Sequence, residues 1–194
     1  MRIRNLTSAD SERVYDAFRS VSVDRNQQSI PKSGFFEYPL SLDDIRSRLQ
    51  DNRFSLVLEE GGNILSYMIA YQMREARSIS HTDPVLSALE GEGDLVYGDQ
   101  LFLSPGTPIF YAGRLADFWT TLVANSNSPG VVCAIPQKPW KNLASTRMAL
   151  ARGFSRQGRV LDGDIELGLF SKPIWTSNEE LARHYYLKVS SGKN

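Results

Sequence analysis

Apolar residues recur with two periods along this chain, and the period distinguishes strands from helices. Residues 2–6 alternate polar and apolar, which predicts a strand. Helical spacing follows in two segments, with the apolar faces Val14, Phe18, Val21 and Leu42, Ile45, Leu49. Ser41 and Asp44 begin the second helix as a variant of the capping box, with Asp in place of Glu.

The middle of the chain predicts three strands and a long irregular segment. Residues 54–60 and 64–71 are strand-like, and Gly61-Gly62 between them predicts a hairpin turn. Residues 74–94 are polar and irregular apart from an expected short helix in residues 84–89. A third strand over residues 95–103 ends at a Ser-Pro-Gly sequence.

The second half contains the clearest helix of the chain. Its apolar stripe is predicted to face the core and consists of Leu115, Phe118, Trp119, Leu122 and Val123. Residues 131–135 predict a buried strand, and Asn142 caps a helix that stops at Gly153. Two strands flank the turn sequence of residues 162–164, and the tail predicts a short helix over residues 178–186.

The expected element order is therefore β-α-α-β-β-β-α-β-α-β-β, with no repeat or linker that divides the chain. Its 194 residues predict one domain, with residues 175–194 as a C-terminal extension. Because Lys+Arg and Asp+Glu both number 22, the zero net charge argues against nucleic acid as the main partner. No segment has a membrane-spanning length of apolar residues and none resembles a signal peptide, so we expect a cytoplasmic protein.

The single cysteine, Cys133, excludes an intramolecular disulfide, and its apolar neighbours predict a buried packing residue. His81 and His184 are isolated from cysteines and from paired acids, so no metal site is expected.

The element order resembles that of the GNAT acetyltransferases over about residues 2–174. Leu101-Phe102-Leu103-Ser104-Pro105 resembles the family's Leu-x-Val-x-Pro strand end, which precedes the cofactor loop. Asn142 followed by Gly153-Phe154 resembles an Asn-x-x-Ala helix with Gly-Phe at the family's spacing. The resemblance implies an α/β fold, with a mixed central sheet of about seven strands flanked by helices.

The resemblance also implies acetyl-coenzyme A as the cosubstrate, with its thioester arm beside the strand of Leu101, Phe102 and Leu103. The pyrophosphate is expected at a helix N-terminus, where the implied cofactor-binding residues are Phe110, Tyr111, Ala112, Gly113 and Arg114. The family's loop has the form (Arg/Gln)-x-x-Gly-x-(Gly/Ala), and only Gly113 matches it here, because Pro108 and Tyr111 occupy the other two positions. Asn142 has two interpretations, as a helix cap and as a contact of the pantetheine arm.

Acetyl transfer needs a base that takes a proton from the attacking ammonium. Asp99 is the candidate base, since the family often has an acid at this position, and a solvated or turn-associated Asp is the alternative. Even spacing predicts that Asp99 shares one strand face with Leu101 and Leu103, and that Tyr97 extends this face. The family frequently protonates the departing sulfur with a tyrosine at the position that Ala149 holds here, so Ser145 or a tyrosine from elsewhere in the chain is the candidate substitute.

The expected acceptor is a primary amine of a small molecule or a peptide. By resemblance, the aromatic residues that line the acceptor groove are Phe35, Phe36 and Tyr38, with Tyr97 on the neighbouring strand; packing in the core is their alternative role. Two functions remain from the sequence alone: an N-acetyltransferase, or a non-catalytic GNAT-fold domain that binds acyl-CoA or a protein partner. The resemblance leaves a homodimer open.

Overall fold

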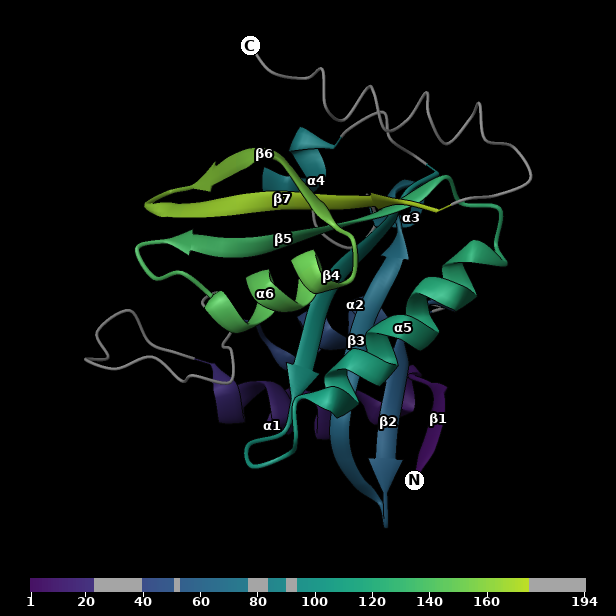
Figure 1. Ribbon diagram of the computed structural model, residues 1–194. Helices are drawn as coiled ribbons and strands as arrows, with labels where there is room; N and C mark the ends of the chain where they lie inside the picture. Colours follow the sequence, from purple (N-terminus) through teal and green to yellow (C-terminus); the bar gives the residue numbers. More distant parts are fainter. Residues whose placement is uncertain (23–39, 51–52, 77–83, 90–93, 175–194) are drawn as a thin grey trace.

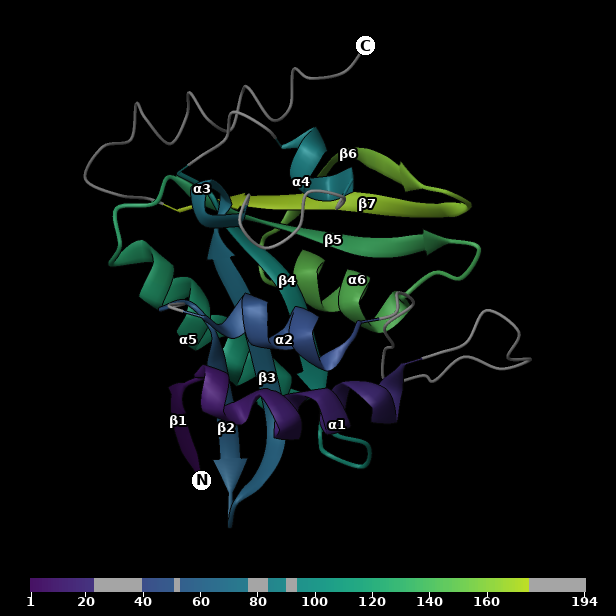
Figure 2. The ribbon, with the colours of Figure 1, turned by 180° about the vertical axis from the view of Figure 1, so that it is seen from behind.

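The computed structural model describes residues 1–22, 40–50, 53–76, 84–89 and 94–174, and these form one mixed sheet with helices on both faces. This mixed sheet has seven strands, as the resemblance implied, and the strand order is β1-β2-β3-β4-β5-β7-β6. The helices α5 and α6 cover one face (Figure 1), and α1 and α2 cover the other (Figure 2).

The strands and helices follow the expected order. The strands are β1 (Arg2–Asn5), β2 (Leu56–Glu60), β3 (Asn63–Gln72), β4 (Val96–Leu103), β5 (Gly130–Lys138), β6 (Ser155–Asp162) and β7 (Ile165–Pro173). The helices are α1 (Ser11–Val21), α2 (Leu42–Leu49), α3 (Met73–Ala76), α4 (Pro84–Ala88), α5 (Phe110–Ala124) and α6 (Leu143–Ala151), with a short 3-10 helix at Ser8–Asp10. The helix α3 was not predicted, and the expected helix over residues 178–186 lies outside the described residues.

Two local signals are confirmed as helix caps. The Asp44 amide donates to the Ser41 hydroxyl at 3.1 Å, and the Asp44 carboxylate accepts from the Ser41 amide at 2.8 Å. The Asn142 side-chain oxygen accepts from the Ser145 amide at 3.1 Å. Each cap satisfies an amide that the first helical turn leaves without an intrahelical partner.

The sheet separates two hydrophobic layers. One layer packs under α1 and α2 and contains Tyr67, Tyr71 and Phe102, while the other lies under α5 and α6 and contains Leu115, Trp119 and Phe154. The prediction that Phe118 faces the core is wrong, because its side chain is 48% exposed. The buried arc of α5 runs instead through Ala112, Leu115, Ala116, Trp119 and Val123.

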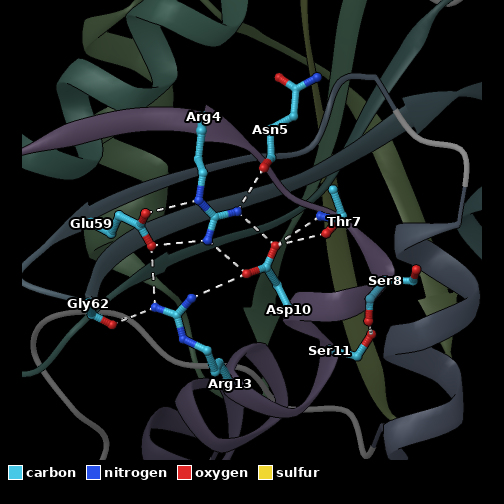
Figure 3. Close-up of polar contacts among 9 residues, drawn as sticks. All are labelled: Arg4, Asn5, Thr7, Ser8, Asp10, Ser11, Arg13, Glu59 and Gly62. Atoms are coloured by element: carbon cyan, nitrogen blue, oxygen red, sulfur yellow. Dashed lines mark hydrogen bonds and ion pairs between the residues drawn. The ribbon is translucent and has the colours of Figure 1, made fainter.

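An ion network joins the first strand and first helix to β2 (Figure 3). The Arg4 guanidinium donates to both Asp10 and Glu59, at 2.8 and 2.9 Å for the shortest contacts. Arg13 reaches the same two carboxylates from α1. The hydrogen bonds from Arg4 lower the pKa of Asp10 and of Glu59 and raise the pKa of Arg4.

Candidate active site

The candidate site begins where β4 and β5 stop pairing. These two strands are parallel and pair at Val96 with Val131, Tyr97 with Val132, and Gly98 with Cys133. Beyond this point β4 stays paired with β3, and β5 stays paired with β7. The strands diverge, and α6 lies across the angle between them (Figure 1).

A pocket opens in this angle, and we call it the β4–β5 pocket. Its walls come from β3, β4, β5, the two helices above them and the residue after α6. Four residues predicted from the sequence line it together, namely Asp99, Leu101, Asn142 and Ser145. The tertiary structure therefore brings the candidate base, the candidate acid and the capping asparagine to one cavity.

Asp99 points to a different face of the sheet from the one that the sequence predicts, and its bonding partners were not predicted. The register between β3 and β4 shifts at Ile69/Ala70, so Asp99 is an extra residue of a bulge. Its carboxylate accepts from Arg48 Nε at 2.8 Å and from the Tyr71 hydroxyl at 3.2 Å, on the α2 side of the sheet. The prediction that Asp99 shares a face with Leu101 is wrong, because Leu101 packs in the layer under α5.

The other residues predicted on β4 point to both faces of the sheet. Tyr97 is buried with an edge-on contact to Tyr71, so it does extend the face of Asp99. Phe102 is buried on the same side and stacks on Tyr67. Leu103 is half-buried at the strand end.

The first turn of α5 lies next to the pocket without lining it. Phe110 and Arg114 are exposed, Tyr111 is half-buried against Phe110, and Ala112 and Gly113 are buried. Two of the amides expected to hold a phosphate are already bonded, since Tyr111 N donates to the Pro108 carbonyl at 3.1 Å and Gly113 N donates to the Ile109 carbonyl at 3.2 Å.

Arg152 is a site residue that the sequence reasoning missed. It follows α6, lines the pocket and donates to the Asp117 carboxylate at 2.9 Å. A Cβ atom on Gly113 would lie 2.1 Å from the Arg152 guanidinium, so the guanidinium rests directly on the backbone of α5. Only the glycine at position 113 leaves room for this contact.

Trp119 was predicted as a core residue, which is confirmed, but it also lines the pocket. A Cβ atom on Gly98 would lie 3.1 Å from the Trp119 ring, so the absence of a side chain on β4 lets the ring pack onto the strand. Cys133 is half-buried in the pocket wall rather than fully buried, and desolvation raises the pKa of its thiol to about 12. The thiol is therefore neutral at physiological pH.

Several predicted residues lie outside the described part of the chain, namely Phe35, Phe36, Tyr38, His81 and His184. Within the described part, no cluster of three or more metal-ligating side chains is found. No helix among the described residues is long and apolar enough to cross a membrane.

Solved structures resemble this protein over most of its length. The ribosomal-protein-S18-alanine N-acetyltransferase from Escherichia coli is similar with a TM-score of 0.61 and 12% sequence identity, over 89% of this chain and 93% of that chain. The chain has the GNAT fold. The loading GNATL domain of CurA from Lyngbya majuscula matches with a TM-score of 0.63 at 14% identity, over 89% of this chain and 97% of that one.

A third GNAT-fold structure is Chaetomium thermophilum Naa20 in complex with a bisubstrate analogue. It matches with a TM-score of 0.62 at 10% identity, over 95% of this chain and 91% of that chain. No family model matches the sequence, and no curated protein matches it. At these identities the likeness establishes the GNAT fold. Activity has to be argued from the residues of the site.

Proposed function

We propose that this protein is an N-acetyltransferase, which transfers the acetyl group of acetyl-coenzyme A to a primary amine in a ternary complex. The observation that carries the proposal is the pocket in the angle between β4 and β5, whose lining includes both the candidate base and the candidate acid. A thioester arm in this pocket would lie beside the edge of β4 that β5 has left, where backbone groups are available to it. The neighbouring folds named as N-acetyltransferases support the same reaction class.

Residues of this chain are available for two parts of an acyl-CoA, the pantetheine arm and the pyrophosphate. Asn142 and the backbone of Leu101–Leu103 would hold the pantetheine arm, and the first turn of α5, residues 110–114, would face the pyrophosphate. The Arg152 guanidinium beside Gly113 supplies a positive charge at this end of the pocket. A guanidinium binds phosphate oxygens well, so Arg152 compensates for the two amides that are already bonded within the chain.

The transfer step would use Asp99 and Ser145. Asp99 takes a proton from the substrate ammonium, through a water molecule or directly, and the neutral nitrogen then attacks the thioester carbonyl carbon. A C–N bond forms and the C–S bond breaks. The departing sulfur takes a proton from the Ser145 hydroxyl or from water, and that oxygen is reprotonated by the second proton that the nitrogen loses as the amide forms. Arg48 and Tyr71 hold the Asp99 carboxylate in place, so they would act as positioning residues.

The acceptor is proposed as a small-molecule or peptide amine, reached from the α2 side of the sheet, where Tyr97 and Asp99 lie. The Escherichia coli neighbour is named for acetylating an alanine of a ribosomal protein, which agrees with an amine acceptor. The sequence also predicts a single domain over residues 1–194, a cytoplasmic location and a possible homodimer.

A non-catalytic acyl-CoA-binding domain is the second candidate. Two observations favour it: Asp99 is buried against Arg48, and two of the amides in the first turn of α5 are bonded within the chain. A protein of this kind would bind the thioester without transferring its acyl group. Binding and turnover therefore need separate measurements.

Calorimetric titration of the full chain with acetyl-coenzyme A tests the pocket. We expect micromolar binding that a Ser145→Trp variant abolishes, because the indole would fill the pocket wall. Leu150→Trp is the matched control, since Leu150 lies on the same helix, is 52% exposed and does not line the pocket. No binding at millimolar acetyl-coenzyme A would overturn the proposal.

Release of the coenzyme A thiol in the presence of an amine panel then tests catalysis. We expect amine-dependent release that an Asp99→Asn variant reduces by a factor of about 100 or more, the usual contribution of a general base. Circular dichroism must show that the variant is folded. Tight binding without release for any amine would favour the non-catalytic candidate.

A further inference from the structure

One end of the β4–β5 pocket runs beneath α5, across β4 toward β3. We call it the α5 end of the pocket, and its lining residues are Met68, Leu101, Ala116 and Trp119. Met68 and Trp119 are at most 5% exposed, and Leu101 packs in the same hydrophobic layer. All four side chains are apolar or aromatic, so this end favours hydrocarbon over a hydrated group.

Small residues help to keep this region open. The lining of the pocket includes one alanine from each helix above it, Ala116 of α5 and Ala149 of α6. Both alanines are buried, with exposed fractions of 6% and 8%. A larger side chain at either position would enter the cavity, so the two methyl groups leave space that a ligand can occupy.

We propose that the α5 end of the pocket binds an acyl chain longer than acetyl. The inference deepens the proposed function and rests on it, because the chain is the acyl group of the coenzyme A thioester. It names the donor class as acyl-CoA thioesters with linear aliphatic chains longer than acetyl. Chain length is limited by how far the pocket extends beneath α5.

Calorimetry with coenzyme A and its acetyl, butyryl and hexanoyl thioesters tests the donor class. Each buried methylene is expected to tighten binding by about fourfold, so hexanoyl-coenzyme A binds more tightly than acetyl-coenzyme A. Affinity that is flat or falls with chain length, while coenzyme A itself binds, would overturn this inference and leave the proposed function standing. If coenzyme A and every thioester fail to bind, the proposed function fails.

A thioester that lacks the nucleotide distinguishes failure of this inference from failure of the proposed function. S-hexanoyl-N-acetylcysteamine has the acyl chain and the carbonyl but lacks the pyrophosphate. We expect it to bind more tightly than its acetyl counterpart, whether or not the nucleotide has a site. Equal affinity of the two short thioesters would contradict the inference directly.

Matched variants test where in the pocket the acyl chain binds. Ala149→Leu fills the pocket from α6, so the ratio of hexanoyl to acetyl affinity should fall by a factor of about 10 or more, the loss of two to three buried methylenes. Ala151→Leu is the control, since Ala151 lies on the same helix, is exposed and does not line the pocket. An unchanged ratio in Ala149→Leu would show that the chain lies elsewhere.

A second variant protects the test against misfolding. Ala116→Val adds less volume, from α5, and should lower the same ratio by a smaller factor. An unchanged ratio in folded Ala116→Val would contradict the position assigned to the acyl chain.

Discussion

At the scale of single residues, the site depends on a buried charge pair and on a glycine. Arg48 and Asp99 form an ion pair of 2.8 Å, and both side chains are at most 6% exposed. Because the pair is almost fully removed from water, removing one partner is expected to destabilise the fold strongly. The exposed pair of Arg46 and Asp43 on the same helix has similar geometry in solvent, and it supplies a natural control.

We expect Asp99→Asn to lower the free energy of unfolding by about 3–5 kcal/mol, because it removes the charge of the carboxylate that bonds the buried Arg48 guanidinium at 2.8 Å. Asp43→Asn should change the same quantity by less than about 1 kcal/mol. Urea denaturation measures both. In the double variant Arg48→Met with Asp99→Asn, the loss should be smaller than the sum of the single losses. Additive losses would mean that the two residues do not interact energetically.

Gly113 and Arg152 form a second pair that can be tested by coupling. Alanine is favoured over glycine within a helix by about 0.5–1 kcal/mol, but a methyl group at position 113 would displace the Arg152 guanidinium. We therefore expect Gly113→Ala to be neutral or destabilising in the parent protein and stabilising in an Arg152→Ala background. Chemical denaturation of the four proteins gives the comparison. Equal effects in both backgrounds would exclude the predicted contact.

At the scale of elements, β1 is an edge strand that an ion network fastens to α1 and β2. The Arg4 guanidinium bridges Asp10, beside the start of α1, and Glu59 on β2 (Figure 3). Both carboxylates have a lowered pKa in the folded protein, chiefly through the hydrogen bonds from Arg4. A lowered pKa means that folding favours the ionised carboxylate, and the network then stabilises the fold above the carboxylates' ordinary pKa.

This network predicts an acid-sensitive part of the stability. As pH falls from about 5 to about 3, the unfolded carboxylates take up protons first, so the stabilisation by the network is lost progressively. We expect Arg4→Gln to reduce stability at neutral pH by on the order of 1 kcal/mol and to flatten the pH dependence in this window. Arg2→Gln on the same strand is the control, since Arg2 is exposed. A parallel pH profile in Arg4→Gln and the parent would contradict the assignment.

At the scale of the whole molecule, the packing of the sheet between its two helical layers sets the environment of Cys133 in the pocket wall. Cys133 is the single cysteine of the chain, and the pKa of its thiol is raised from about 9 to about 12 by burial. A thiol reacts as its thiolate, so this shift lowers the thiolate fraction at neutral pH by a factor of about 1,000. The rate of alkylation at Cys133 therefore reports on the integrity of the fold.

We expect iodoacetamide to label Cys133 slowly in the native protein and rapidly in urea. Mass spectrometry of the intact chain follows the single addition without interference from other thiols. The native rate should rise with urea in parallel with unfolding measured by circular dichroism. Rapid labelling without denaturant would contradict the raised pKa of the Cys133 thiol in the native protein.

The sequence alone determined the features that depend on neighbours along the chain. Ser41 with Asp44 and Asn142 with the Ser145 amide are caps formed within three residues, so their signals are local. Strand and helix periods fixed the element order for the same reason, because alternation and helical spacing are properties of a single segment. The order and the Pro-ended strand then led to the GNAT fold, which the solved structures confirm.

Only the tertiary structure decided which of these residues share the pocket. The bulge that turns Asp99 toward Arg48 arises from the register between β3 and β4, and no pattern within β4 reveals it. Met68 and Arg152 reach the pocket from segments far apart in the chain. Such contacts depend on how strands pair and how helices pack on them, and these arrangements bring together residues whose spacing in sequence carries no signal.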